Sequence, residues 1–335
     1  MKLSVLMLTY NHENFIAQAI DSVLMQQVNF DYEIVIGEDC SIDKTRDILK
    51  GYSYRYPDKF RLLLPQENLG MMKNLMQTLE ACNGEYVAIV EGDDYWTSVD
   101  KLQKQVDFLD SNPHLSTCFH NVNVVYEDGD IRSHPFHMQF PSYEHSTIKP
   151  LPISTLEDIV PGNFIQTCSV MFRNKLFGPF PHWFITMPLG DWPLHILNAQ
   201  RGNIGYIDQI LSVYRVHKGG VWSSNMSKFR KIEDFKKVIY CYDTINKHFN
   251  FRYKQSIRKK LARLYLGAIN LCAETGQKQQ IIKFTAKYLS SLSLPEILNQ
   301  RNLLILLFKA YFPLPFKFLR LIKSVFQNNF SSLGM

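Results

Sequence analysis

The first 90 residues alternate short apolar runs with segments whose apolar residues recur every three or four positions. The runs suit buried strands, and the periodic segments suit helices that cover a sheet. In chain order they are 3–10 (strand), 13–27 (helix), 32–39 (strand), 41–57 (helix, opened by Ser41 or Asp43 as its cap), 60–65 (strand), 71–82 (helix) and 85–90 (strand). This order predicts an α/β fold, with an open, mostly parallel sheet that is covered on both faces.

Polar residues follow every predicted strand, at the point where the strand ends. They are Thr9-Tyr10-Asn11, Glu38-Asp39, the stretch 67–70 and Asp93-Asp94. In open α/β sheets, ligands bind beyond the carboxyl ends of the strands. Each group alone could be a helix cap or a turn, but four groups at one edge indicate a binding site.

The adjacent carboxylates Asp93 and Asp94 need a positive partner or water, because each disfavours the ionised form of the other. The chain has neither the G-x-G-x-x-G pattern after its first strand nor a P-loop, so a glycine cradle for phosphates is absent. Carboxylates can hold a diphosphate only through a cation, and Mg²⁺ or Mn²⁺ suits oxygen ligands. The pair therefore predicts a divalent metal shared with a phosphate ligand.

Charge divides the 335 residues into two regions. Residues 1–224 carry a net charge of −9, and residues 225–335 carry +15. This asymmetry indicates two regions with different partners. Six cysteines without a C-x-x-C pair signal neither a zinc site nor a disulfide framework, so a reducing cytoplasm is expected. The apolar run 303–308 is too short to span a membrane, and the N-terminal run is too short for a signal peptide.

Five stretches resemble the inverting family 2 glycosyltransferases with the GT-A fold. They are LSVLMLTYNHENFIAQAIDSVLMQQ, IVIGEDCSIDKTRDIL, ENLGMMKN, EYVAIVEGDDYW and, at residues 190–220, GDWPLHILNAQRGNIGYIDQILSVYRVHKGG. The resemblance covers about the first 220 residues. It implies a GT-A domain over residues 1–224, followed by a basic, helical C-terminal region over residues 225–335.

The resemblance also implies roles for individual residues. The donor nucleotide sugar would be bound by Thr9, Tyr10, Asp39, Lys73 and Asp93, with Tyr10 against the base and Asp39 accepting from a base N–H. The metal would be held by Asp94 as the main ligand, with Asp93 and His217. Asp191 would be the general base, although Gly190 stands where the family usually has another acid.

Each role has a plainer alternative. Asp191 could be a cap of the helix that follows it, without a catalytic role, since Pro193 suits a first turn. His217 could be an ordinary structural contact, Asp39 a turn residue and Tyr10 a packing residue at the edge. Trp183 and Trp222 could stack on acceptor sugars or simply fill a core, and loop positions suit His134 and His137 better than a metal site does.

The predicted activity is metal-dependent transfer of a sugar, with inversion, from a nucleotide donor, most simply a UDP-sugar, to a saccharide acceptor. The acceptor expected is lipid-linked or part of lipopolysaccharide, O-antigen or capsule, by analogy with the family. Two alternatives are a sugar-nucleotide nucleotidyltransferase and an inactive sugar-nucleotide-binding scaffold. The first should have a Gly- and Arg-containing loop after strand one, and the second should have lost Asp94 or Asp191.

The C-terminal stretch 302–330 combines cations with a helical apolar stripe. Such a stripe could pack on the catalytic domain, or it could lie in the headgroup region of an anionic membrane. The surplus of positive charge favours the second reading, which predicts a cytoplasmic protein held peripherally on the inner face of the membrane. A nucleic-acid partner is not expected.

Overall fold

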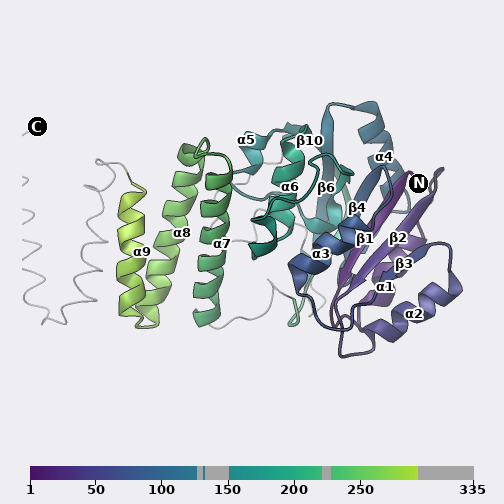
Figure 1. The fold of residues 1–335 in the computed structure, drawn as a ribbon, viewed down its shortest axis with the longest axis horizontal. Coiled ribbons are helices and arrows are strands. Elements are labelled where there is room, and N and C mark those ends of the chain that lie inside the picture. The colour runs from purple at the N-terminus through teal and green to yellow at the C-terminus, as the bar shows by residue number, and fades with distance from the viewer. Residues whose placement is uncertain (127–130, 133–150, 221–227, 293–335) are drawn as a thin grey trace, which may run out of the picture. The chain divides into compact units, whose positions relative to one another are not determined.

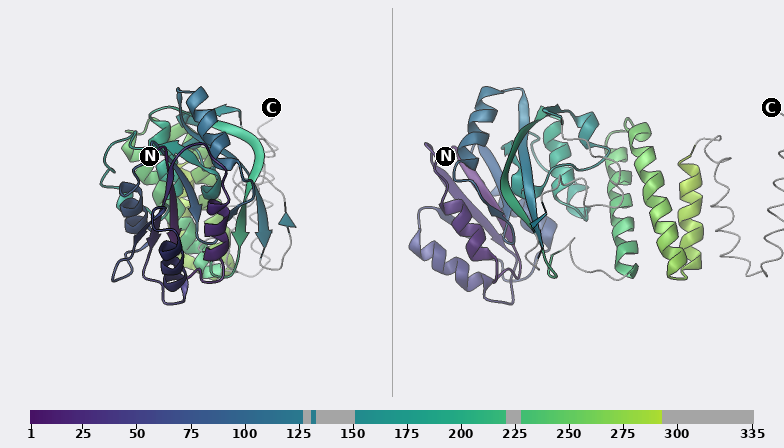
Figure 2. Two further views of the ribbon diagram at one scale, coloured as in Figure 1. Left: turned by 90° about the vertical axis from the view of Figure 1, so that its right-hand side faces the viewer. Right: turned by 180° about the vertical axis from the view of Figure 1, so that it is seen from behind.

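The computed structural model describes residues 1–126, 131–132, 151–220 and 228–292, which include a ten-stranded mixed sheet. Four parallel strands form one half of it, in the spatial order β3 (Phe60–Leu63), β2 (Tyr32–Glu38), β1 (Leu3–Thr9) and β4 (Tyr86–Glu91). Figure 1 shows these strands side by side at the N-terminal end of the chain, and Figure 2 shows them from two further sides. All residues of β2 are buried, as a strand covered on both faces requires.

The other half of the sheet contains the antiparallel strands. β9 (Met171–Arg173) lies between β4 and β6 (Leu115–Tyr126), and β6 runs parallel to β10 (Asn203–Val216). The short strands β7 (Ile131–Arg132) and β8 (Ile153–Ser154) pair with β6 and β10, and β5 (Tyr95–Trp96) pairs with β10. Since β5 directly follows the acidic pair, its pairing with β10 brings that pair beside the end of β10.

Helices cover both faces of the parallel half. One face packs on α1 (Ile16–Leu24), α2 (Thr45–Arg55) and α4 (Lys101–Ser111), which share a single apolar core with β1, β2 and β4. The opposite face packs on α3 (Met71–Glu80), where the amide of Asn74 donates to the Gly37 carbonyl at 2.9 Å. A Cβ at Gly37 would lie 2.0 Å from Thr78 Oγ1, so only glycine allows α3 to approach this closely.

Shorter helical segments complete this part of the chain. They are α5 (Leu156–Ile159), η3 (Thr167–Ser169), η4 (Phe184–Thr186) and α6 (Asp191–Ala199), of which α6 contacts β6. The C-terminal described residues form α7 (Lys228–His248), α8 (Lys254–Glu274) and α9 (Lys278–Ser290). The predicted α/β class with a helical C-terminal region is therefore confirmed.

The second helix, α2, begins at Thr45, with Lys44 rather than Ser41 or Asp43 at the cap position. Asp43 nevertheless binds the first residue of the helix, because its Oδ1 accepts from the Thr45 amide at 2.9 Å. Its Oδ2 accepts from the Glu13 amide, and Ser41 Oγ accepts from the Asn11 amide. The polar residues before α2 bind the preceding loop rather than only their own helix.

The chain divides into two compact units. One contains residues 1–226 and 236–260, and the other contains residues 227–235 and 261–335. Helices α7 and α8 each contribute residues to both units, so the boundary predicted at residue 224 stays a prediction. Within the second unit, Gly267 lies against the ring of Phe235. Among the described residues, every helix is too short or too polar to cross a bilayer.

Lys101 is fully buried, and its ammonium lies 3.7 Å from the centre of the Trp96 ring, with no hydrogen-bond partner. Burial lowers the pKa of Lys101 to about 7. Between about pH 7 and pH 10.5, the folded state thus binds fewer protons than the unfolded state. The free energy of unfolding should therefore rise with pH over that interval. Below it, the cost of burying the charged ammonium should be present in full.

We predict that Lys101→Met stabilises the protein by roughly 2–4 kcal/mol at pH 6, because it removes a buried charge. The gain should shrink toward pH 9, where the lysine is neutral in the folded state. Urea unfolding of both proteins at the two pH values measures this, with the exposed Lys50→Met as the control. An equal difference at both pH values would contradict the burial argument.

Candidate active site

The carboxyl ends of β1, β2 and β4 lie level at one edge of the sheet. Thr9 pairs with Glu38, and Leu8 pairs with Glu91, in the register of the strands. The Asp39 amide donates to the Thr9 carbonyl at 3.0 Å, which ties the first two ends together. The residues that follow these strands therefore start from a common edge, as the sequence analysis expected.

The loop after β1 is bonded to the loop after β2 in both directions. Five hydrogen bonds of 2.8–3.0 Å join them: Asn11 N to Ser41 Oγ, Ile42 N to Asn11 Oδ1, His12 N to Thr45 Oγ1, Glu13 N to Asp43 Oδ2 and Lys44 N to Glu13 Oε2. The two loops thus form one rigid frame. Tyr10 stands on this frame with 43% of its surface exposed, so its ring is open to a ligand.

Asp39 is buried and holds the loop before α3. Its carboxylate accepts from the amides of Leu69 and Gly70 at 2.7 and 3.0 Å. The turn role is therefore present, and contact with a nucleotide base stays a prediction. Lys73 lies exposed on the first turn of α3.

The two acids of the Asp93-Asp94 pair have different surroundings. Asp94 is 1% exposed, and its Oδ1 accepts from the Arg215 amide at 2.9 Å. Its Oδ2 is buried and, among the described residues, has no nitrogen or oxygen donor at hydrogen-bond distance. The Asp93 side chain is 18% exposed, and its Oδ2 lies 3.0 Å from His217 Nε2 and 3.7 Å from His12 Nε2. Asp93 is thus the more accessible carboxylate of the pair.

Their pKa values move in opposite directions. Burial, and then the charge of Asp93, raises the pKa of Asp94 well above its ordinary value. Burial alone would raise the pKa of Asp93 as well, but the hydrogen bond with His217 and the charge of His12 lower it overall. Burial also lowers the pKa of His12 despite the nearby carboxylate. The surroundings of the pair therefore favour the ionised form of Asp93 more than that of Asp94.

Arg215 fixes the acidic turn to the end of β10. Its guanidinium donates to the Asp93 carbonyl and to Gln18 Oε1, both at 2.6 Å. It also lies over the rings of Phe15 and Tyr95, at 4.6 and 5.1 Å from their centres. Together with the Arg215 amide on Asp94, these contacts hold the turn from both its backbone and its side chain.

Asp191 is the first residue of α6, and Gly190 occupies the cap position. The Oδ2 atom of Asp191 accepts a hydrogen bond from the side-chain amide of Asn163 at 2.8 Å. Burial raises the pKa of Asp191, although the amides of Trp192 and Asp191 and the side chain of Asn163 act in the opposite sense. Burial and the charges of Asp94, Asp93 and Asp191 also raise the pKa of Glu91. The charge of the predicted base, Asp191, therefore affects the same residue, Glu91, as the charges of Asp93 and Asp94 do.

The donors on this edge are compatible with a metal that a ligand helps to hold. Among the described residues, no group of three or more His, Cys, Asp or Glu side chains is arranged to hold a metal ion without further ligands. However, Mg²⁺ is usually bound by one or two carboxylates together with substrate phosphates. The ionised Asp93 and the adjacent His217 suit such a shared site.

Sequence reasoning missed His12, Arg215 and Asn163 at this edge. Arg215 stands two positions before His217, which directly follows β10, and in an extended segment this spacing favours the same side, so it could have identified Arg215. His12 stands two positions after Tyr10, whereas Asn163 lies in an irregular segment without a pattern. Trp183 is partly buried and donates to His248 Nδ1, while Trp222, His134, His137 and the stretch 302–330 lie outside the described residues.

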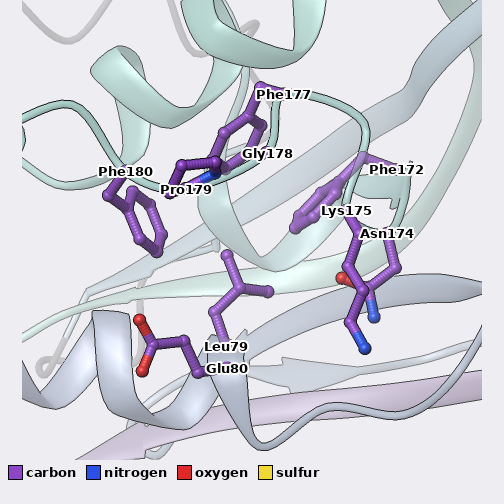
Figure 3. Close-up of a pocket in the computed structure, with 9 residues that line it drawn as sticks. All are labelled: Leu79, Glu80, Phe172, Asn174, Lys175, Phe177, Gly178, Pro179 and Phe180. Atoms are coloured by element: carbon purple, nitrogen blue, oxygen red, sulfur yellow. The ribbon is translucent and has the colours of Figure 1, made fainter.

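A pocket of about 150 Å³ lies away from this edge (Figure 3). Apolar side chains supply most of its lining, including Leu79, Phe172 and Phe177. Asn174, also in the lining, donates to the carbonyls of Cys82 and Gly84, just before β4 begins. The pocket is therefore near the opposite end of β4 from the acidic pair, and it contains none of the predicted site residues.

Comparison with known proteins places the chain in a family. The model of Glycosyl transferase family 2 matches residues 4–177. An uncharacterized protein of Mycobacterium tuberculosis is 39% identical over 230 residues, which are 68% of this chain and 63% of that protein. The chain thus spans less than two thirds of the length of this relative.

Two solved structures are similar in fold. Residues 1–349 of Staphylococcus aureus TarS, in complex with UDP-GlcNAc, align with a TM-score of 0.52 and 19% identity, covering 87% of this chain and 89% of that one. The mannosyltransferase PcManGT of Pyrobaculum calidifontis, in complex with GDP-Man and Mn²⁺, aligns with a TM-score of 0.54 and 16% identity, covering 92% and 85%. Since the family model covers more than half of the sequence and the fold agrees with these structures, the chain belongs to glycosyl transferase family 2.

Proposed function

We propose that the chain transfers a sugar from a nucleoside-diphosphate donor to a saccharide hydroxyl, with inversion at the sugar carbon. The observation that carries this proposal is the contact of Asp93 with His217 just after the end of β4, where the charge of Asp191 also raises the pKa of Glu91, the last residue of that strand. The contacts of Asp93 favour its ionised form, and burial raises the pKa of Asp191. These are the properties that a metal–diphosphate ligand and a general base require.

The donor is proposed to be a UDP-sugar. The related fold of TarS is found in complex with UDP-GlcNAc, whereas PcManGT is found with GDP-Man. In this chain, the exposed Tyr10 ring would face the base, and Asp39 would accept from its ring N–H. Asp39 already accepts two backbone amides, but a carboxylate has about four acceptor sites in all, so a base N–H can be added.

The metal is proposed to be Mn²⁺ or Mg²⁺, held by Asp93 and His217 together with the donor diphosphate. The sequence alone favours Asp94 as the main ligand, whereas the accessibility of the two acids favours Asp93. The Asp93 side chain is 18% exposed, while Asp94 is 1% exposed and has one oxygen on the Arg215 amide. When bound, the cation would stabilise the charge of the departing nucleoside diphosphate.

Asp191 is proposed to accept the proton of the acceptor hydroxyl as its oxygen bonds to the sugar carbon. The bond from that carbon to the diphosphate oxygen breaks from the opposite side, so the diphosphate leaves with the electron pair. The Asn163 amide would orient the carboxylate by donating to one of its oxygens, and a carboxylate has enough acceptor sites to receive the hydroxyl as well. A raised pKa makes Asp191 a stronger base than an ordinary carboxylate.

The acceptor is proposed to be a lipid-linked or growing bacterial surface saccharide. TarS is named as a poly(ribitol-phosphate) β-N-acetylglucosaminyltransferase, and 116 of its residues are 31% identical to this chain. Peripheral attachment to the inner face of the cytoplasmic membrane would place the site near such an acceptor. Incubation with a panel of nucleotide sugars, Mn²⁺ and candidate acceptors tests the activity through the release of nucleoside diphosphate. Release of pyrophosphate instead would favour a nucleotidyltransferase.

We predict that Asp93→Asn weakens Mn²⁺-dependent binding of UDP by at least about tenfold, because the ligand loses its charge. Asp94→Asn should change it less than about threefold, since an amide oxygen can still accept from Arg215. Calorimetric titration with UDP in Mn²⁺ and in chelator measures both. If Asp94→Asn were the damaging variant, Asp94 would be the main ligand, as the sequence alone suggested.

We predict that Asp191→Asn lowers the turnover rate by at least about 10²-fold and leaves the affinity for UDP within a few-fold of wild type. The amide keeps the shape and the Asn163 contact but cannot accept a proton. The exposed Asp107→Asn is the matched control, and steady-state kinetics with UDP titration measure the two effects.

The wild-type rate should fall as the pH drops below the raised pKa of Asp191, because only the ionised carboxylate is a base. This acidic limb should be lost in Asp191→Asn. A variant that kept a near-normal rate and the same limb would leave Asp191 as a helix-terminal residue only.

We predict that the full-length protein floats with anionic vesicles but not with neutral ones, and that high salt partly releases it. Replacing Lys317, Arg320 and Lys323 together by Gln should reduce flotation, because these cations lie off the apolar stripe of the sequence. Replacement of the exposed Lys44, Lys50 and Lys73 is the control for net charge. Failure of the wild type to float would favour packing of the stripe on protein.

A further inference from the structure

We propose that His12 is a positioning residue for Asp93, and that it couples the binding of the nucleotide to the binding of the metal. This inference rests on the proposed function and adds a residue to it. His12 lies in the turn between Tyr10, which would face the base, and α1. Its ring reaches from that turn to the carboxylate that would hold the metal.

Asp93 stands between two imidazoles that approach the same oxygen. His217 Nε2 lies 3.0 Å from Asp93 Oδ2, and His12 Nε2 lies 3.7 Å from it. The two rings are 6.3 Å apart and nearly perpendicular, at 80°. The side chains of His12 and His217 are only 16% and 6% exposed, so little water competes with them for the carboxylate. His217 is at hydrogen-bond distance, whereas His12 makes a longer contact, so His12 limits the rotation of Asp93 mainly by occupying the space on its other side.

The position of the His12 ring is fixed by the glycine of the acidic turn. A Cβ at Gly92 would lie 2.8 Å from His12 Nδ1 and 2.6 Å from Thr9 Oγ1. The ring therefore packs directly on the backbone between Glu91 and Asp93, in space that any other residue would fill. This close approach explains why a glycine stands between acids at the end of a buried strand.

The backbone of His12 is held as firmly as its ring. The His12 amide donates to Thr45 Oγ1 at 2.8 Å, and its carbonyl accepts from the amides of Phe15 and Ile16 at 2.9 and 2.8 Å. The turn cannot shift without breaking contacts to α2 and the start of α1. A nucleotide bound against Tyr10 would therefore contact the same rigid frame that holds His12, and through it Asp93. Metal and nucleotide should then each strengthen the binding of the other.

The test measures how much Mn²⁺ strengthens the binding of UDP, and in a parallel series of GDP, by calorimetry in Mn²⁺ and in chelator. For His12→Ala we expect the gain from Mn²⁺ to fall roughly tenfold, as when a residue behind a metal ligand is lost. His12→Gln should recover most of the gain, because its side chain fills similar space and presents an N–H toward Asp93. The affinity for UDP in chelator should stay within about threefold of wild type. General damage to the structure would lower this metal-free affinity as well, so the two effects can be told apart.

His114→Gln is the matched control, since His114 is an exposed histidine outside the site. Gly92→Ala provides a second route, because its methyl group would displace the His12 ring without changing a polar group; it should reduce the gain as His12→Ala does. A full gain from Mn²⁺ in His12→Ala, beside a clear gain in wild type, would overturn this inference alone. No gain in wild type with either nucleotide would overturn the proposed metal–donor site, and this inference with it.

Discussion

The candidate site depends on the pairing of β5 with β10. This short antiparallel pair, in which Trp96 lies opposite Ser212, turns the chain back immediately after the acidic pair. The turn is then fixed by Arg215, whose amide binds the Asp94 carboxylate and whose guanidinium binds the Asp93 carbonyl. Because residue 215 is 121 positions from Asp94, the contact closes a long loop, and it can persist only if the whole sheet between them is formed. The position of His217 beside Asp93 follows from the same closure.

The sequence was sufficient to predict the parallel half of the sheet, because β1, β2 and β4 are continuous apolar runs followed by polar residues. It also predicted that Asp93 and Asp94 would stand at the edge where those strands end. It did not predict β5, β8 or β9, since two or three residues are too few to show a period and their pairing is decided by distant partners. For the same reason it could not show that Asp93 and Asp94 have different surroundings. That difference depends on which acid receives the amide of Arg215 and which receives the imidazole of His217.

Burial at this edge disfavours the ionised form of every acid, and the surrounding contacts determine which acids are nevertheless favoured as carboxylates. Glu91, Asp94 and Asp191 all have raised pKa values with burial as the largest cause, whereas the partners of Asp93 more than offset the same effect. Like charges this close favour a proton on some of the acids unless a cation arrives. A divalent cation would supply the missing positive charge, so an edge without three preformed ligands is still prepared to receive one together with a diphosphate.

Opposite pKa shifts also separate the two proposed tasks. A metal ligand must stay ionised, and the lowered pKa of Asp93 meets that need through His217 and His12. A general base must instead hold a proton for part of each cycle, and burial at the start of α6 raises the pKa of Asp191 toward that range. If the two surroundings were exchanged, Asp93 would lose the charge that a cation requires, and Asp191 would become too weak a base. The proposed division of work between the two carboxylates therefore rests on where the fold buries each one and on which donors it places beside them.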